Sequence, residues 1–374
     1  MKVLILANDD GGLYRFRREL IQELINCHSV YISVPDTGFT DDIRAIGCRV
    51  LVNKRLERRG TNPFADLKLL QYYETILKRL KPDIVFTYTI KPNVYGGIVC
   101  GKNQVPYVAN ITGLGTSIEN GGSLQKLTLL LYRAGLGKAQ KVFFQNKMNR
   151  DFMVSRHVVS GRHDILPGSG VNLEQYKVLD YPEGETIDFL FVARVMKEKG
   201  IDQYLDAAKA IGQRHPETRF HVCGICEEDY EEILREYEKE KIIIYHGMVK
   251  DMSEMYRLCS CTVHPTYYPE GLSNVLLESA ASGRPVITTN RPGCREVIDD
   301  GINGYLVKKK DSGDLIRVLE RFIGLNTEER RRMGLAGRKK VEREFDRRIV
   351  VRKYIEELNE VERKSEQGDG IDGL

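Results

Sequence analysis

Short, almost wholly apolar runs alternate with longer amphipathic runs along most of the chain, and this alternation restricts the fold more than any other feature. The apolar runs are residues 2–7, 29–34, 48–52, 83–88, 106–111 and 141–145, followed by 187–194, 218–224, 241–247, 261–265 and 285–290. Such runs are typical of parallel strands that helices cover on both faces. The intervening runs, among them 199–212, 251–259, 272–282 and 312–323, carry the apolar spacing of helices. The pattern predicts an α/β chain with two Rossmann-like, doubly wound parallel sheets.

The division between the two domains is expected within residues 170–186, which are rich in turn residues and lack periodicity. A chain of 374 residues is long enough for two separate cores. We therefore predict an N-terminal domain at 1–172 and a C-terminal domain at 173–346. A helix at 347–362 is expected to pack back across the joint, and the polar, glycine-rich tail at 363–374 is expected to be disordered.

Positive charge is concentrated in the first half of the sequence. Residues 1–175 contain 24 Lys and Arg against 15 Asp and Glu, which favours an anionic partner on that side: membrane lipid, a phosphorylated acceptor or nucleic acid. Basic residues interleaved with stacking aromatics are not evident, and neither is any nucleic-acid-binding motif, so we expect no nucleic acid.

The sequence predicts a cytoplasmic protein without a membrane span. No apolar run reaches the roughly 18–20 residues of a transmembrane helix. The N-terminal segment MKVLILANDDGG turns acidic and glycine-rich after six apolar residues, whereas a signal peptide needs a longer apolar region and a cleavage site.

Four cysteines raise the question of a metal site. Cys223, Cys226, Cys259 and Cys261 could supply thiolates to zinc. However, Cys223 and Cys261 fall in strand-like apolar runs, where a reduced cysteine behaves as a small apolar residue. We therefore expect ordinary reduced cysteines and no metal.

Two cations and two glutamates stand out in the second half. Arg194 and Lys199 lie between a strand and a helix, where a guanidinium and an ammonium can bind a diphosphate. Glu270 lies in a turn, and a helix is expected to begin near Leu272, so that backbone amides of Gly271, Leu272, Ser273, Asn274 and Val275 form an anion cradle. Glu278 lies in an apolar stretch, where a carboxylate needs hydrogen-bond donors such as sugar hydroxyls.

Glycines follow other strand-like runs of the second half. Gly224 and Gly247 each end a strand at the same expected sheet edge, as does the turn at 291–294. Turns of this kind let a flat base or a phosphate approach the backbone. Without other information, a basic turn and two helix-surface glutamates would explain the same residues, so these features alone do not decide the function.

In the first half, Gly11 and Gly12 separate the first strand from a helix expected to begin at Tyr14. This is no dinucleotide fingerprint, because G-x-G-x-x-G is absent. Tyr14 and Arg17 occupy the first turn of that helix, where a solvated face or an anionic acceptor would each explain them. Lys91, Asn93 and Gly115 follow later strands in polar or glycine-rich turns.

Residues 123–141 carry a stripe of Leu124, Leu127, Leu130 and Leu131 at helical spacing, with Lys126, Arg133, Lys138 and Lys141 beside it. Such a stripe is compatible with a membrane interface. Core packing is the more common reason for apolar residues at this spacing. Both alternatives remain open at this point.

The element from Glu270 to Glu278, with HPTYYPEG around it, ASGRPVITTNRPGCREVI after it and DGINGYLV at 300–307, resembles glycosyltransferase family four. The resemblance covers about 1–362 and implies retaining enzymes of the GT-B fold, in which two Rossmann-like domains face each other across a cleft. It implies that Arg194 and Lys199 bind the donor diphosphate, that Glu270 contacts the donor sugar and that Glu278 binds the ribose hydroxyls. Amides of 272–275 would hold the phosphates, and Gly12, Gly224 and Gly247 would approach the donor.

The residues YRFR, NPF (62–64), KPN and GLG resemble the bacterial subgroup that extends polyprenyl-diphosphate-linked oligosaccharides. This resemblance implies transfer of a hexose or N-acetylhexosamine from a UDP-sugar to a lipid-linked glycan, without a metal. It also implies a peripheral protein on the cytoplasmic face of the inner membrane. Gly11, Tyr14, Arg17, Lys91, Asn93 and Gly115 would then contact the acceptor. Many members use a cleft histidine in this half, and none can be placed here. Alternatives are a GT-B sugar-nucleotide epimerase, a non-catalytic nucleotide-sugar-binding protein and, most weakly, a nicotinamide oxidoreductase.

Overall fold

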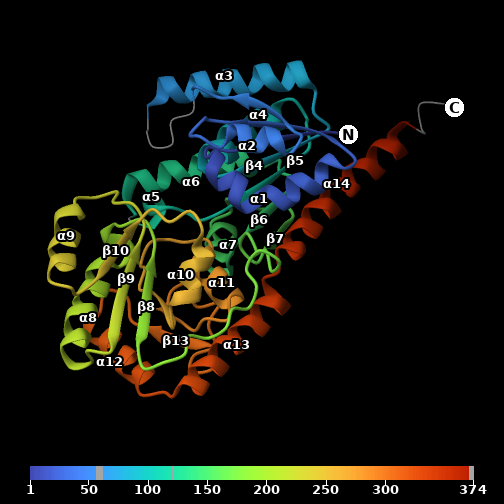
Figure 1. The fold of residues 1–374 in the computed structure, drawn as a ribbon. Helices are drawn as coiled ribbons and strands as arrows, with labels where there is room; N and C mark the ends of the chain where they lie inside the picture. The colour runs from blue at the N-terminus through green and yellow to red at the C-terminus, as the bar shows by residue number, and fades with distance from the viewer. Residues whose placement is uncertain (56–61, 120, 370–374) are drawn as a thin grey trace. The chain divides into compact units, whose positions relative to one another are not determined.

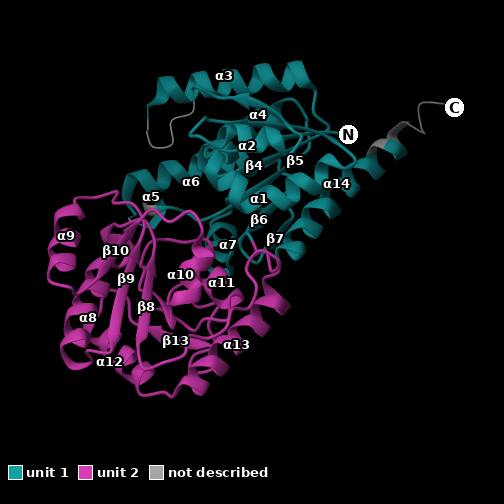
Figure 2. Ribbon diagram, viewed as in Figure 1, with its two compact units in different colours: residues 1–169, 347–374 teal, residues 170–346 magenta. Residues whose placement is uncertain are grey.

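A computed structural model describes residues 1–55, 62–119 and 121–369 (Figure 1). The chain forms two compact units (Figure 2). Unit 1 contains residues 1–169 together with the chain from Arg347 onward, and unit 2 contains residues 170–346. The change from one unit to the next therefore falls close to the expected position at 172–173.

Unit 1 is a parallel α/β unit. Its strands are β1 Lys2–Leu6, β2 Ser29–Val34, β3 Arg49–Val52, β4 Ile84–Tyr88, β5 Tyr107–Ile111, β6 Lys141–Phe144 and β7 His163–Ile165. Its helices are α1 Asp10–Ile25, α2 Thr40–Ala45, α3 Pro63–Leu80, η1 Pro92–Gly96, α4 Gly97–Lys102, α5 Thr116–Glu119, α6 Gly122–Leu136, α7 Lys147–Ser155 and α14 Arg347–Asp369. Within the described residues the sheet order is β3-β2-β1-β4-β5-β6-β7, and every neighbouring pair is parallel. The chain reverses its direction of winding between β1 and β4, so this is the switch point of the sheet.

The two faces of the unit 1 sheet bury alternate residues of each strand. Val3 and Ile5 of β1 pack into a cluster with α1 and α14, whereas Leu4 and Leu6 pack into a cluster with α3 and α4. Successive side chains of a strand point to opposite faces, so a strand covered on both sides must be apolar throughout. This explains why Lys2 is the only polar residue in the run at 2–7.

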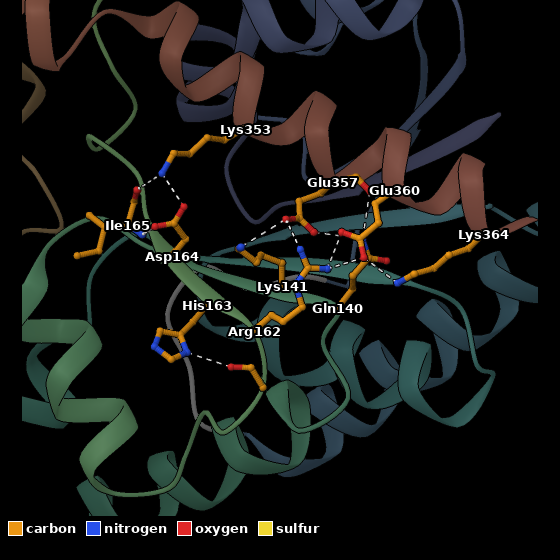
Figure 3. Close-up of polar contacts among 11 residues, drawn as sticks. Gln140, Lys141, Arg162, His163, Asp164, Ile165, Lys353, Glu357, Glu360 and Lys364 are labelled. Atoms are coloured by element: carbon orange, nitrogen blue, oxygen red, sulfur yellow. Dashed lines mark hydrogen bonds and ion pairs between the residues drawn. The ribbon is translucent and has the colours of Figure 1, made fainter.

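The C-terminal helix α14 is longer than predicted. It continues through Asp369, which corrects the expectation that the chain is disordered from residue 363; the rest of the predicted tail, 370–374, lies outside the described residues. Its apolar side joins the unit 1 core, and its polar side meets β7 and the start of β6. There Lys353 pairs with Asp164, and Arg162 pairs with Glu357 and Glu360 (Figure 3).

Unit 2 has the same architecture. Its strands are β8 Ile187–Val192, β9 Thr218–Cys223, β10 Ile244–Gly247, β11 Cys261–His264, β12 Val286–Thr289 and β13 Gly304–Val307. Its helices are η2 Lys197–Lys199, α8 Ile201–Arg214, α9 Glu231–Lys239, α10 Met252–Leu258, α11 Asn274–Ala281, α12 Ser312–Ile323 and α13 Thr327–Glu344. The described strands form a parallel sheet in the order β10-β9-β8-β11-β12-β13. Its switch point lies between β8 and β11, and ligands of open α/β sheets bind outside the carboxyl ends of the strands at such a point.

The predicted strands agree with the structure to within a few residues, but β7 and several helices, among them α2, α4, α7, α9 and α13, were not predicted. None of the helices in the described part of the chain has the length and apolar character needed to traverse a bilayer. The described residues also contain no group of three or more His, Cys, Asp or Glu placed to hold a metal ion.

Candidate functional site

Arg194, Lys199 and Glu270 come together at the switch point of unit 2. Arg194 follows β8, and Lys199 ends the short helix η2 in the same loop. Glu270 lies in the loop after β11, the strand next to β8. β8 and β11 are adjacent parallel strands, and the loops after their carboxyl ends bring the three predicted side chains together.

The ring of Tyr268 lies close to both cations. The Nζ atom of Lys199 is 4.6 Å from the centroid of this ring, and the Cζ atom of Arg194 is 5.5 Å from it. Both distances are in the range of a cation–π interaction. Each cation also has a carboxylate partner: Nη1 of Arg194 donates to Oε2 of Glu227 at 2.5 Å, and Nζ of Lys199 donates to Oε1 of Glu270. The arrangement holds two positive charges side by side, which is what a diphosphate requires.

Glu227 and Glu270 place a negative charge beside Arg194 and Lys199 respectively. Burial favours the protonated form of Glu270, but the ammonium of Lys199, and to a smaller extent the guanidinium of Arg194, hold the pKa of Glu270 below its usual value. Burial likewise opposes the charge on Arg194, and the hydrogen bond and negative charge of Glu227 overcome this and raise the pKa of Arg194. A guanidinium has five N–H donors and an ammonium three, so both cations retain donors for a ligand.

Tyr268 and Glu227 were not predicted from the sequence. Glu227 reaches Arg194 because the loops after β8 and β9 pair with each other: the amide of Val195 donates to the carbonyl of Ile225 at 2.8 Å, and the amide of Glu227 donates to the carbonyl of Val195 at 3.1 Å. The only local sign of Tyr268 is its position in the loop that carries Glu270.

The predicted anion cradle begins two residues later than expected, because α11 starts at Asn274 and not near Leu272. Ser273 is the residue before the helix, and its amide already donates to the carbonyl of Gly293 at 2.8 Å. The amides of Asn274 and Val275 belong to the first turn, where an α-helix offers no acceptor of its own. Gly271 and Leu272 lie in the loop before it.

Gly293 explains why the loops after β11 and β12 fit closely together. It has a φ of +87°, and a Cβ atom at this position would lie 2.9 Å from the Cβ of Glu270 and from the carbonyl oxygen of Gly271. Only glycine permits both the left-handed backbone and this approach. The contact fixes the position of the loop that carries Glu270.

The other predicted donor residues have partners within unit 2. Glu278 accepts a hydrogen bond from the buried hydroxyl of Tyr256 at 3.2 Å, which is a donor that the apolar sequence around it did not reveal. The amide of Gly224 donates to the carbonyl of Gly247 at 2.7 Å. A Cβ atom on Gly224 would lie 1.7 Å from the carbonyl oxygen of Ala193, so this glycine is needed for the close packing of the loops after β8 and β9.

His264, the last residue of β11, is buried behind the cluster. Its Nε2 atom is 3.2 Å from Oγ of Ser273, which links β11 to the start of α11. Burial, with a smaller contribution from the Lys199 ammonium, lowers the pKa of His264 to about 4 despite the opposing charge of Glu270. The imidazole is therefore neutral at physiological pH.

Because of His264, the free energy of unfolding of unit 2 is expected to fall by about 2 kcal/mol between pH 7 and pH 5. An unfolded histidine titrates near pH 6.5, whereas the folded one titrates near pH 4. Between these values the unfolded chain binds more protons, so stability is full above pH 6.5 and is lost as the pH falls towards 4. Urea unfolding at both pH values should give a pH dependence that is smaller by this amount in the His264→Gln variant. An equal dependence in the variant would contradict the burial of a neutral imidazole.

In unit 1 the helix α1 begins at Asp10, and not at Tyr14 as predicted. The buried carboxylate of Asp10 accepts hydrogen bonds from the hydroxyl of Thr37 and from the amides of Thr37, Phe39 and Gly11. These bonds outweigh the effect of burial and lower the pKa of Asp10. Asp10 thus connects the start of α1 to the loop at Thr37 and Phe39. This contact explains why the helix begins within the glycine-rich segment that was expected to be a turn.

Gly12 and Tyr14 lie in the first turns of α1. A Cβ atom on Gly12 would lie 2.6 Å from the carboxylate of Asp9. The ring of Tyr14 lies 5.9 Å from that of Phe39. Gly11 is also close to Phe39, since a Cβ atom there would lie 3.1 Å from its ring.

Two predicted acceptor residues are interior residues of unit 1. Arg17 is buried, with its guanidinium 5.0 Å from the ring centroid of Tyr88. Asn93 is fully buried: its Oδ1 accepts from Thr87, and its Nδ2 donates to the carbonyl of Asn110. These contacts place both side chains among partners within unit 1, and their contact with an acceptor stays a prediction.

Lys91 and Gly115 follow β4 and β5 respectively. The ammonium of Lys91 is 2.9 Å from Oδ1 of Asp66, whose other oxygen accepts from the hydroxyl of Tyr95. Gly115 has a φ of +75°. Gly11, Tyr14, Lys91 and Gly115 are further candidates for contact with an acceptor.

Comparison with known proteins identifies relatives over nearly the whole chain. The family described as Glycosyl transferases group 1 matches residues 179–340, and the family described as Glycosyl transferase 4-like matches residues 2–146. An uncharacterized glycosyltransferase of Methanocaldococcus jannaschii is 30% identical over 290 residues, which is 73% of this chain and 74% of the relative.

A second relative is the N,N'-diacetylbacillosaminyl-diphospho-undecaprenol alpha-1,3-N-acetylgalactosaminyltransferase of Campylobacter jejuni. It is 25% identical over 375 residues, covering 95% of this chain and 97% of the relative. Among solved structures, Anabaena HepE in complex with UDP and glucose has a TM-score of 0.77 at 17% identity and covers 96% of this chain and 99% of its own. The two parallel α/β units and these relatives agree: the chain is a GT-B glycosyltransferase and belongs to the family-four-like, group 1 glycosyltransferases.

Proposed function

We propose that the protein transfers a sugar, a hexose or an N-acetylhexosamine, from a UDP-sugar to a hydroxyl of a glycan carried on polyprenyl diphosphate, with retention of anomeric configuration. The observation that carries the proposal is the pair of cations, Arg194 and Lys199, held beside Tyr268 at the switch point of unit 2. The name of the Campylobacter jejuni relative describes a diphospho-undecaprenol acceptor, and HepE was solved with UDP. Both names support the proposed substrates.

The proposed reaction breaks the bond between the anomeric carbon and the β-phosphate oxygen and forms a bond between that carbon and the acceptor oxygen on the same face. The proton of the acceptor hydroxyl passes to a phosphate oxygen of the departing UDP. Negative charge grows on the β-phosphate, and Arg194, Lys199 and the first amides of α11 stabilise it. Glu270 would hold the donor sugar and Glu278 the ribose, while Gly11, Tyr14, Lys91 and Gly115 would contact the acceptor.

The two cations supply the charge that a divalent metal supplies in other transferases, so we propose turnover without a metal. The proposed place of action is the cytoplasmic face of the membrane that holds the polyprenyl acceptor, in the synthesis of cell-surface polysaccharide or glycan. Treatment with EDTA is expected to leave the rate unchanged.

The test is a transfer assay with a polyprenyl-diphosphate-linked sugar and a panel of UDP-hexoses and UDP-N-acetylhexosamines. Mass spectrometry of the lipid product is expected to show the addition of one sugar from one donor, and NMR to show the anomeric configuration of that donor. An inverted product would contradict retention. Epimerised UDP-sugar without transfer would identify an epimerase, and nucleotide-sugar binding without turnover would identify a binding protein.

A further inference from the structure

Helix α6 has one face buried in unit 1. Its residues Thr128, Tyr132 and Leu136 are buried, and Gly135 lies directly against the backbone of η1, since a Cβ atom there would be 2.5 Å from the Cα of Val94. Such a close approach leaves the helix firmly seated. The apolar residues needed for packing into unit 1 are therefore on this side.

A second apolar side of α6 is exposed. Leu124, Leu127 and Leu130, which we name the leucine face, have exposed fractions of 46%, 54% and 60%. They are spaced three residues apart, so they lie along the same side of the helix. Leu131, the fourth leucine of the predicted stripe, packs against the unit 1 core instead. Single exposed leucines need no explanation, but a row of them marks an interaction site.

The sequence around the leucine face carries positive charge alone. From residue 120 to residue 150 there is no Asp or Glu, while Lys126, Arg133, Lys138, Lys141, Lys147 and Arg150 are present. Lys126, Arg133 and Lys138 are exposed. Arg133 donates to the carbonyls of Arg156 and His157, and Lys138 to that of Gly101. A carbonyl carries no net charge, so these bonds do not neutralise Arg133 and Lys138, whereas Lys141 and Arg150 pair with Glu357 and Asp151.

We propose that the leucine face docks unit 1 on an anionic lipid bilayer. The leucines enter the boundary between head groups and acyl chains, and Lys126, Arg133 and Lys138 lie against lipid phosphates. A helix with an exposed apolar stripe and a basic flank binds in the plane of such an interface, and each cation near an anionic leaflet strengthens the binding. A second copy of the chain is a poorer occupant, because it would bring like charges together.

This inference deepens the proposed function, because an acceptor on a polyprenyl lipid is held in a membrane. Docking would keep unit 1 next to the acceptor while the sugar donor arrives from solution. Binding to vesicles can nevertheless be measured without donor or acceptor, so the two proposals fail separately. Loss of docking with intact UDP-sugar chemistry overturns only the docking site, and docking without any transfer overturns only the function.

The experiment is flotation of the full chain with vesicles of phosphatidylcholine mixed with phosphatidylglycerol, and with vesicles of phosphatidylcholine alone. The wild type is expected to bind the anionic vesicles and to be released by salt. The triple variant Leu124→Ser/Leu127→Ser/Leu130→Ser should bind at least about tenfold more weakly, and Lys126→Glu should weaken binding to anionic vesicles only. The control Ile233→Ser/Ile244→Ser/Ile302→Ser changes three exposed apolar residues of unit 2 and should bind as the wild type does.

Two results would overturn the docking proposal. One is a triple variant that binds anionic vesicles as tightly as the wild type. The other is a dimer, seen by light scattering without lipid, that the triple variant abolishes, because the leucine face would then be covered by a second copy. Circular dichroism and a thermal melt confirm that each variant is folded.

Discussion

Arg194→Ala is expected to lower kcat/KM for the UDP-sugar by about 10²–10³-fold while the protein stays folded. The guanidinium lies in the loop after β8, beside Lys199 and over the ring of Tyr268. In the proposed reaction it meets the charge that develops on the departing phosphate, so its loss raises the barrier to bond cleavage. The measurement is steady-state kinetics of nucleotide release or transfer at varied donor concentration.

Lys197→Ala is the matched control for this variant. Lys197 lies in the same loop and is exposed, and its backbone amide donates to the carboxylate of Glu228 at 2.8 Å. Removing its side chain should leave kcat/KM within about twofold of the wild type, as is usual for surface substitutions. Equal activity of Arg194→Ala and Lys197→Ala would remove Arg194 from the donor site.

Deletion of residues 347–374 is expected to unfold unit 1 and to leave unit 2 folded. Val350, Tyr354, Leu358 and Val361 of α14 are part of the same core cluster as β1 and α1. Burial of a large apolar side chain contributes about 1.5–3 kcal/mol, so the four together approach the total stability of a typical domain, about 5–15 kcal/mol. The hydroxyl of Tyr354 also accepts from Nδ2 of the buried Asn110 at 2.8 Å, and its ring lies 5.0 Å from that of Phe86.

The deletion is tested by thermal unfolding and limited proteolysis of residues 1–346. We expect the unit 1 transition to disappear and a protease-resistant fragment close to 170–346 to survive. The control Arg162→Ala removes the ion pairs of a half-exposed guanidinium with Glu360 and with the buried Glu357 (Figure 3). Lys141 still pairs with Glu357, so the expected cost is that of a surface pair, about 0–1 kcal/mol. A truncated chain with both transitions intact would show that α14 is dispensable for unit 1.

The repeating strands and the donor residues could be predicted because their signals are local. A strand buried on both faces is almost wholly apolar, and β1, β4 and β8 can be identified from sequence in this way because each contains a single clearly polar residue, Lys2, Thr87 or Asp188. Arg194, Lys199 and Glu270 lie just after strands, and parallel topology brings the ends of neighbouring strands to one edge. The alternation of strands and helices along the sequence was therefore enough to predict that these three residues lie at one edge of the sheet.

The features that were missed depend on contacts between segments distant in sequence. Glu227 reaches Arg194 only because two loops pair, and Tyr268 lies close to both cations because the loop after β11 bonds to the loop after β8 through the amide of Tyr267 and the carbonyl of Glu198. Arg17 and Asn93 look like polar edge residues, yet Tyr88 and Asn110 from neighbouring strands take them into the interior. The hydrogen bonds that hold Asp10 at the start of α1 likewise cannot be predicted until Thr37 and Phe39 are known to lie beside it.

The measurement that tests the account most directly is nucleotide release from a panel of UDP- and GDP-sugars by the purified protein, with and without a polyprenyl-diphosphate-linked sugar, beside the Arg194→Ala/Lys199→Ala variant. We predict release from one UDP-sugar, faster with the acceptor, and its loss in the double variant. Release that persists unchanged in the double variant, or no release from any donor even with the acceptor present, would contradict a donor site at the switch point of unit 2.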